Sequence, residues 1–282
     1  MIKRIHAWLE LIRLPNLFTV PGDVIAGGLL SGKTGLEILP YVFASLFVYS
    51  AGLILNDVAD LREDQKARPL RPLPSGRISV RSAKIVAGIL IVAAAGLVFV
   101  FGEGGRSLMF PLLACVLLYD FGWRSIWVMA ACRGLNVLLP AGVSGLDAEV
   151  LAAAGVVAVF VWSVSLLAKH ETMKRKLYPL TYLPAVALAV SFAVMKYRFH
   201  PVPWFHYAGM AAVFRMLAVG VELGHDPEPA AVQKAVGYWL CGLPLVQGIL
   251  ILAVPEVNLL WVLGVLSLWT AASFSAKKFY AS

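Results

Sequence analysis

Long apolar segments recur along the whole chain, and they limit what it can fold into more than any other feature. A lipid bilayer with a hydrocarbon core about 30 Å thick is crossed by about 20 apolar residues in a helix that rises about 1.5 Å per residue. The 282 residues are 60% hydrophobic and only 14% charged, whereas soluble domains average about 25% charged residues. We therefore predict an all-α fold, a polytopic transmembrane helical bundle, in which residues 1–282 form one domain.

The hydropathy pattern predicts ten membrane-spanning helices. Pro21, Gly22 and Asp23 interrupt the first segment, and the fourth is short. Gly and Pro are nevertheless tolerated in a membrane where neighbouring helices satisfy the freed backbone groups. The predicted helices are 14–31, 38–56, 82–101, 107–120, 125–143, 149–168, 179–196, 204–221, 235–254 and 257–274.

Basic residues are distributed unevenly between the two predicted faces of the membrane. With ten spans, both termini share a side with the loops at 57–81, 121–124, 169–178 and 222–234. That side holds 18 of the 24 Lys and Arg residues, against four on the opposite side and two within spans. Because Lys and Arg accumulate on the cytoplasmic side, we predict an integral protein of a bacterial inner membrane with both termini in the cytoplasm. The net charge of +8 then indicates topology and an affinity for anionic membrane lipid, not for nucleic acid.

A charged stretch follows the second predicted span. Residues 56–79 read NDVADLREDQKARPLRPLPSGRIS and include three aspartates and four arginines. If the helix continues through them, Asn56, Asp60 and Asp64 recur at i, i+4 and i+8, with Asp57 beside them. Carboxylates at a helix C-terminus repel one another and the negative end of the helix dipole, so the pattern predicts a bound cation. Mg²⁺ prefers such oxygen ligands. The alternative is a solvated polar loop.

The same stretch resembles the first signature of the UbiA-type intramembrane prenyltransferases, NDxxDxxxD followed by an Arg-Pro-Leu-x-Ser-Gly-Arg segment. Both parts are present, at 56–64 and at 71–77, and the resemblance extends to RLPNLFTVPGDVIAGG near the start and to the order of the spans. It implies a nine-helix core, to which 257–274 would be an added helix. It also implies a Mg²⁺ site at Asp57, Asp60 and Asp64, with diphosphate contacts from Asn56, Arg68, Arg71 and Arg77.

The chemistry of such an enzyme suits these residues. Breaking an allylic carbon–oxygen bond develops negative charge on the departing diphosphate, which a metal ion and arginines stabilise. Positive charge develops on the prenyl carbon, which an apolar chamber inside a helical bundle shields from water. The resemblance therefore predicts Mg²⁺ as the cofactor, with a prenyl diphosphate and a small lipophilic acceptor as the substrates.

The second Asp-rich signature of the family is degraded, which would make the chain a divergent member. The segment that ends the sixth predicted span reads LLAKHETMKRKLYP, and its only acidic residue is Glu171. One interpretation gives Glu171 a share in metal binding and lets Lys169 and Lys176 bind the diphosphate directly. Another is that prenyl transfer has been lost, or that the ligand is a different phosphorylated lipid. A plain basic flank of the sixth helix also explains the lysines.

The turn between the fourth and fifth predicted spans, LLYDFGWRS, resembles a Tyr-x-x-x-Lys-Arg segment of the family that faces the acceptor. Tyr119 and Arg124 match it, whereas Trp123 replaces the lysine. The resemblance therefore adds Tyr119 and Arg124 to Asp57 and Asp60 as candidate catalytic residues. A charge inside a span is costly, so Arg133 is expected to face the chamber or to pair with Asp120 or Asp23.

Two functions follow from these observations. The first is an enzyme that transfers an isoprenoid chain from its diphosphate to a small acceptor, with an aromatic acceptor among the candidates. The second is a non-catalytic relative that binds or moves an isoprenoid or phosphorylated lipid within a biosynthetic or export assembly. The degraded second signature is the feature that supports the second function.

Overall fold

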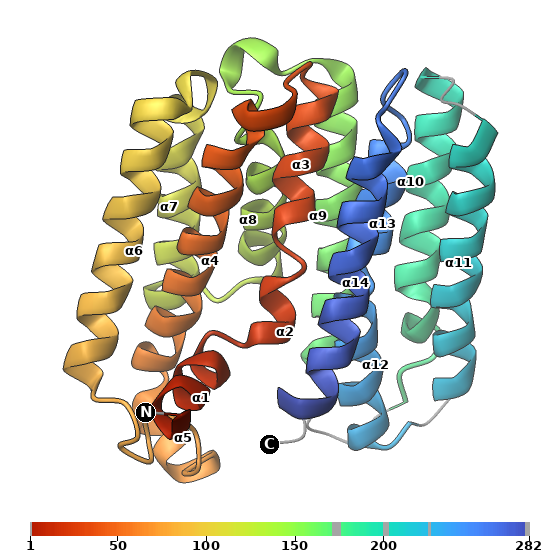
Figure 1. Ribbon diagram of the computed structural model, residues 1–282. Helices are drawn as coiled ribbons and strands as arrows, with labels where there is room; N and C mark the ends of the chain where they lie inside the picture. The colour runs from red at the N-terminus through yellow and green to blue at the C-terminus, as the bar shows by residue number, and fades with distance from the viewer. Residues whose placement is uncertain (1, 171–175, 200–202, 225–226, 280–282) are drawn as a thin grey trace.

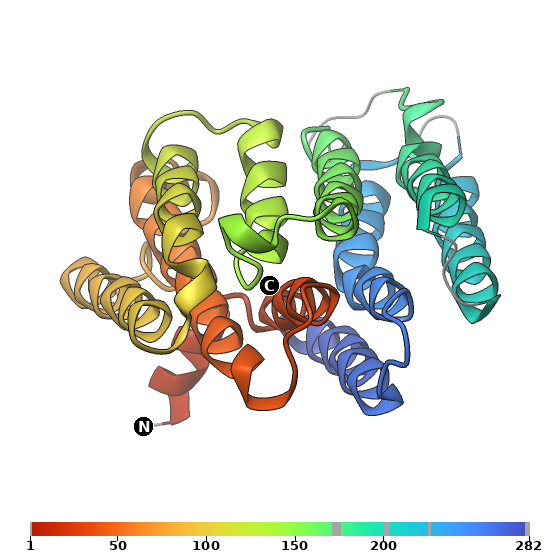
Figure 2. The same ribbon diagram turned by 90° about the horizontal axis from the view of Figure 1, so that it is seen from above.

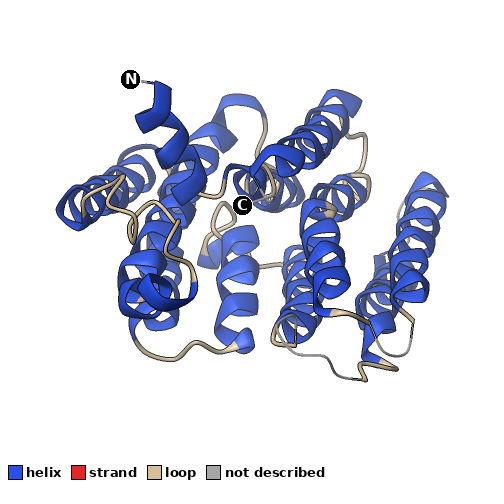
Figure 3. Ribbon diagram, turned by 90° about the horizontal axis from the view of Figure 1, so that it is seen from below, coloured by secondary structure: helices blue, strands red, loops and turns tan. Residues whose placement is uncertain are grey.

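The computed structural model describes residues 2–170, 176–199, 203–224 and 227–279, and the fold within them is entirely helical (Figure 3). Four short 3-10 turns connect the helices: η1 (Gly35–Ile38), η2 (Glu103–Gly105), η3 (Val143–Gly145) and η4 (Leu180–Tyr182). The α-helices are α1 (Ile2–Leu11), α2 (Leu14–Leu17), α3 (Pro21–Leu30), α4 (Leu39–Ala59), α5 (Leu61–Ala67), α6 (Val80–Phe101), α7 (Arg106–Phe121), α8 (Ile126–Leu138), α9 (Ala148–Ala168), α10 (Leu183–Phe199), α11 (Pro203–Leu223), α12 (Pro229–Cys241), α13 (Leu243–Ile251) and α14 (Leu259–Phe279).

A helix or a pair of consecutive helices lies at each of the ten predicted spans. Seven segments of the described residues are long and apolar enough to cross a membrane, and Leu14–Leu30 and Ile126–Leu138 are shorter apolar helices. The predicted interruption of the first span is confirmed, because α2 ends at Leu17 and a new helix, α3, begins at Pro21. The ninth span is likewise divided into α12 and α13. These observations confirm the prediction of an all-α integral membrane protein.

The long helices run roughly parallel, and α1, α5 and the last turns of α14 lie together at one end of the bundle (Figure 1). We call this end the α5 end. Odd and even spans alternate in direction, so α4 and α9 also finish there. The two ends of the described chain thus lie on the same side, as an even number of spans requires.

Helix α3 occupies the middle of the bundle, where α4, α8, α13 and α14 surround it (Figure 2). It crosses α8 closely because Gly27 has no side chain: a Cβ there would lie 1.8 Å from the backbone oxygen of Val137. Asp23, in the first turn of α3, is completely buried. The central helix therefore brings a charged side chain into the apolar interior.

Helix α14 is an integral part of the bundle. It packs along α13 and also contacts α2, α3 and α12. Helices α10 and α11 form a hairpin at the edge, where α10 packs on α9 and α11 on α12 and α13 (Figure 2). The predicted added helix thus covers the N-terminal helices, and the α10–α11 pair is the peripheral one.

Candidate active site

A cavity of about 440 Å³ extends from the α5 end into the bundle. Asn56, Arg124 and Lys169 line it where α4, α8 and α9 meet that end, and Ser45 and Asn136 line it deeper inside. Its walls are mostly apolar, from Val20, Val48, Leu53, Leu112, Val116, Ile126, Met129, Val161, Leu240 and Leu243. The cavity therefore joins a charged mouth to walls that are mostly apolar, with a few polar side chains at its inner part.

The acidic stretch does not form one continuous helix. Helix α4 ends at Ala59, and α5 starts at Leu61. Asp60 lies at the junction, where its N–H still donates to Asn56 O at 2.9 Å and its own carbonyl oxygen accepts from Asp64 N at 2.9 Å. The predicted i, i+4, i+8 row thus bends at its middle member, and the three aspartates have different surroundings.

Each of the three aspartates pairs with an arginine. Asp57 is buried and accepts a hydrogen bond from Arg13 at 3.0 Å. Arg71 donates to the buried Asp64 at 2.7 Å and lies 3.9 Å from Asp57, so one guanidinium bridges two carboxylates. The ion pair of Asp60 is with Arg124, from the turn before α8. The aspartates and their arginines thus form a cluster of alternating charges at the α5 end. Arg13 and Arg124 of this cluster line the cavity, whereas the three aspartates and Arg71 lie beside its mouth and are not among the lining residues.

Arg13 is a site residue that sequence reasoning missed. It lies between α1 and α2 with a φ of 47° and a ψ of 63°, the left-handed region that few residues other than glycine adopt. It lines the cavity and contacts Asp57, which is 44 positions away in the chain. No local pattern links the two residues, and the only signal in the sequence is a basic residue directly before the first span.

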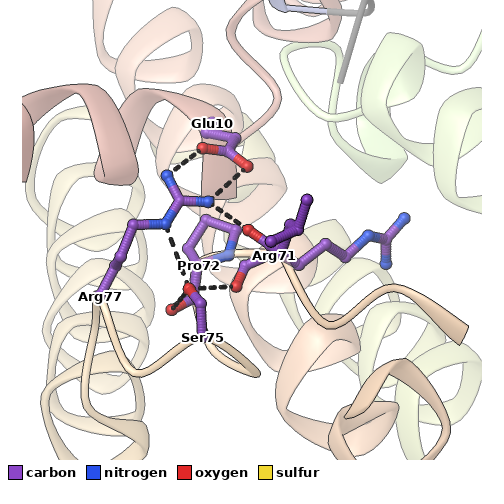
Figure 4. A network of polar contacts seen from close by, with 6 residues as sticks. Glu10, Arg71, Pro72, Ser75 and Arg77 are labelled. Atoms are coloured by element: carbon purple, nitrogen blue, oxygen red, sulfur yellow. Dashed lines mark hydrogen bonds and ion pairs between the residues drawn. The ribbon is translucent and has the colours of Figure 1, made fainter. Parts of the chain in front are cut away.

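Arg77 has a partner outside the aspartate cluster (Figure 4). It donates two hydrogen bonds to Glu10 of α1, at 2.6 and 2.9 Å, and one to the carbonyl oxygen of Leu70. The hydrogen bond to Glu10 raises the pKa of the Arg77 guanidinium above its ordinary value. Arg77 also bonds Ser75, which in turn donates to the backbone oxygen of Arg71 at 2.6 Å. Through this chain of contacts, α1 fixes the loop that carries Arg71.

We expect the substitution Arg77→Gln to loosen the 68–79 loop without unfolding the bundle. A bidentate, charge-assisted contact is lost, but the pair is partly exposed, so its contribution is small. Hydrogen exchange at the amides of Ser75 and Ile78 should become several-fold faster, while exchange in α9 should stay unchanged. Equal protection of the loop in both proteins would show that the Glu10 contact does not hold it.

The remaining predicted site residues are divided between the cavity and the surface. Tyr119, Arg124, Asn56 and Lys169 line the cavity. Arg68 and Lys176 are exposed and do not line it. Glu171 lies outside the described residues. Asp120, which the sequence suggested only as a partner of Arg133, also lines the cavity, and its Oδ2 is buried without a hydrogen-bond partner.

A second polar cluster lies at the inner part of the cavity. Arg133 forms an ion pair with Asp23 at 3.0 Å and donates to the backbone oxygen of Thr19 at 2.7 Å. Asn136 and Gln247 both donate to the Asp23 carboxylate, at 3.0 and 2.6 Å. Of the two partners expected for Arg133, the structure therefore selects Asp23. The pair neutralises two buried charges between α3 and α8.

A model of the UbiA prenyltransferase family matches residues 18–241. The chain belongs to this family. The match covers the acidic stretch, the turn before α8 and helices α4, α7, α8, α9 and α12, which line the cavity. The resemblance found in the sequence is thereby confirmed.

Several archaeal enzymes named digeranylgeranylglyceryl phosphate synthase are similar to this UbiA family member. The one from Sulfolobus acidocaldarius is 32% identical over 143 residues, which is 50% of each chain. The one from Methanopyrus kandleri is 37% identical over 42% of this chain and 44% of the relative. The one from Methanococcus aeolicus is 37% identical over 33% and 35%. The chain thus spans about a third to a half of the curated relatives it matches.

Solved structures share the fold at low sequence identity. A UbiA homolog from Aeropyrum pernix superimposes with a TM-score of 0.67 at 16% identity, over 84% of this chain and 96% of that one. A structure described as digeranylgeranylglyceryl phosphate synthase gives 0.63 at 20% identity, over 95% and 100%. A UbiA homolog from Archaeoglobus fulgidus, bound to GPP and Mg²⁺, gives 0.60 at 14% identity, over 93% and 99%. These likenesses establish the UbiA fold.

The donor set beside the cavity mouth suits Mg²⁺ in its chemistry, because it consists of carboxylate oxygens next to arginines that would bind phosphate. Among the described residues, however, no three His, Cys, Asp or Glu side chains converge as a preformed metal site. Asp57, Asp60 and Asp64 are instead held by arginines. In this UbiA family member the arginines compensate charges that a metal ion would also compensate.

Proposed function

We propose that the chain transfers an isoprenoid group from a prenyl diphosphate to a small lipophilic acceptor within the membrane, with Mg²⁺ as cofactor. The observation that carries this proposal is the cavity of about 440 Å³ whose mouth is lined by Arg13, Arg124 and Lys169 and whose walls are mostly apolar. A prenyl diphosphate has the same two parts, a polyanion and a hydrocarbon chain.

The proposal gives the charged residues distinct roles. Asp57, Asp60 and Asp64 would hold Mg²⁺, with Asn56 beside them, and the metal would neutralise the departing diphosphate. Arg13, Arg71 and Arg124 contact these carboxylates. If Mg²⁺ replaced the arginines as the partner of the aspartates, the arginines would be free to bind the diphosphate oxygens. Tyr119 lines the cavity next to Asp120, where its ring would face the developing cation.

The experiment that tests the proposal is turnover. The purified protein is incubated with Mg²⁺, with labelled prenyl diphosphates of several chain lengths, and with a panel of acceptors. The panel includes aromatic compounds and a glyceryl phosphate lipid, since the similar archaeal proteins are named as synthases of such a lipid. Diphosphate release that requires both Mg²⁺ and an acceptor is the expected result. If no combination of prenyl diphosphate and acceptor gave diphosphate release, the proposed prenyltransferase activity would be rejected.

One observation favours a second candidate function, a non-catalytic protein that binds an isoprenoid or phosphorylated lipid. The three aspartates are all engaged by arginines, and no preformed metal site exists among the described residues. The same assay separates the two functions, because a binding protein would retain prenyl diphosphate without releasing diphosphate.

Substitutions of Lys169 and Lys176 test whether these lysines bind the diphosphate in place of the aspartates that the second signature lacks. Lys169 lines the cavity, whereas Lys176 is exposed beyond the end of α9. If both bind the diphosphate directly, the double substitution Lys169→Gln and Lys176→Gln should weaken diphosphate binding several-fold and make its salt dependence shallower. The single substitutions show how much each lysine contributes to diphosphate binding. Lys84→Gln, on α6, is the control and should leave the binding unchanged. Normal binding by a correctly inserted double variant would leave these lysines as a topology signal.

The same proposal implies an orientation of the protein in the membrane. The α5 end carries the acidic stretch and most of the basic residues outside the spans. We place this end in the cytoplasm, where water-soluble prenyl diphosphates would reach the mouth of the cavity.

A further inference from the structure

A second cavity lies on the outside of the bundle, away from the candidate active site. It is a surface groove of about 280 Å³ between α11, α13 and α14. Its walls are apolar, and small residues at Ala208, Ala211, Ala212 and Gly248 leave the room for it. A Cβ at Gly248 would lie in ordinary van der Waals contact with the Leu266 side chain, at 3.4 Å, so it would narrow the groove without a clash.

One charged residue lines this groove, and it lies at the end nearer the α5 end. Arg215, Leu245 and Trp269 line that end, and Ala208, Leu252 and Val262 line the other. On each of the three helices these positions are seven residues apart, about 10 Å at 1.5 Å per residue. The groove therefore has the polarity of an amphiphile: a cation at one end and an apolar channel leading away from it.

Two aromatic rings hold the guanidinium in place. The Cζ atom of Arg215 lies 5.0 Å from the ring centre of Tyr238 and 5.3 Å from that of Trp269. Such cation–π contacts fix the orientation of the group and leave its charge in place. Arg215 is thus positioned on the rim of the groove by residues of α12 and α14.

The charge of Arg215 has no acidic partner in the described part of the chain. None of the ion pairs found there includes Arg215. The residue is exposed, and it lies eight residues before the end of α11, about 12 Å along the helix. An exposed arginine inside a span is costly unless an anion or water compensates it. Since the groove is apolar, the compensating anion should itself carry a hydrocarbon chain.

We propose that this groove, lined by Arg215, Trp269 and the small residues of α11 and α13, binds an anionic membrane phospholipid. The phosphate would accept hydrogen bonds from Arg215, and the first part of one lipid chain would lie along Ala211 and Ala208. The site is distinct from the cavity of the proposed prenyl transfer and does not depend on it. It would tie the peripheral α10–α11 hairpin to α13 and α14 through the lipid.

The test compares the binding of phosphatidylglycerol and phosphatidylcholine to the full-length protein in detergent. Each lipid is titrated, and its dissociation constant is obtained from the rise in the thermal midpoint, because a ligand that binds only the folded state stabilises it by mass action. Phosphatidylglycerol should bind at least tenfold more tightly than phosphatidylcholine. Inorganic phosphate at the same concentration should give no shift, since it cannot fill the apolar channel.

Two variants address the two halves of the site separately. Arg215→Gln should reduce the preference for phosphatidylglycerol to within twofold of unity, while Lys84→Gln, an exposed basic residue on α6, should leave it unchanged. Ala211→Phe fills the channel and keeps the charge, so it should weaken the binding of phosphatidylglycerol at least fivefold. Ala218→Phe, at an exposed position of α11 outside the groove, is its control. An unchanged preference in Arg215→Gln, or equal losses in Ala211→Phe and Ala218→Phe, would overturn the proposal.

Discussion

The substitution Asp60→Asn is expected to weaken Mg²⁺-dependent binding of a prenyl diphosphate by at least tenfold, or about 1.4 kcal/mol. Asp60 lies where α4 gives way to α5 and forms an ion pair with Arg124 in the turn before α8. Asparagine has nearly the same shape but no charge, so it removes a ligand of a hard cation without opening a cavity. The measurement is equilibrium binding of a labelled prenyl thiodiphosphate at several Mg²⁺ concentrations.

Glu63→Gln is the matched control for this experiment. Glu63 lies three residues later on α5, is exposed, and has no ion pair among the described residues. Glu63→Gln removes one negative charge from the same region as Asp60→Asn does. A general effect of net charge on diphosphate binding would therefore appear in both variants. Binding that is unchanged in Asp60→Asn, or reduced equally in Glu63→Gln, would contradict a metal site at Asp60.

The substitution Asp23→Leu is expected to destabilise the folded protein by about 3–5 kcal/mol, because it leaves the buried Arg133 without its counter-charge. Arg133→Met should have a similar effect by isolating Asp23. In the double variant neither charge remains, so its destabilisation should be at least ~1 kcal/mol smaller than the sum of the single effects. Unfolding in mixed detergent micelles, followed by circular dichroism, gives the four free energies.

The control for the Asp23 experiment is Glu149→Leu. Glu149 lies in the first turn of α9 and is exposed, so its replacement should change the free energy of unfolding by no more than about 0.5 kcal/mol. Additive effects of Asp23→Leu and Arg133→Met would mean that the two charges do not stabilise each other. The neutral double variant could then be used to examine the cavity without this pair.

The positions of the spans could be predicted from the sequence alone. The free energy of placing a segment in lipid depends mainly on the composition of that segment, so the ten apolar segments identified the helices without knowledge of their neighbours. The same local reasoning located the interruption around Pro21 and the acidic stretch at the end of the second span. The acidic stretch also indicated the UbiA family, which the family match over residues 18–241 confirms.

The partner of each charged side chain was decided by the tertiary structure. Arg77 had been grouped with the diphosphate residues by its position in the signature, but it contacts Glu10 of α1. Arg13 carried no signature and contacts Asp57. The roles of these residues in binding remain predictions, because their present contacts do not test them. Neither contact follows from local spacing, since each joins segments that are far apart in the chain.

The reason lies in how a helical bundle is assembled. The sequence determines which segments are helical and which of their faces are apolar, because these properties depend on residues within a few turns of one another. The order of helices around the bundle, and the rotation of each one, depend on close packing between distant segments, such as Gly27 of α3 against Val137 of α8. That packing places Arg133 beside Asp23 and not beside Asp120, and it brings α11, α13 and α14 together around Arg215.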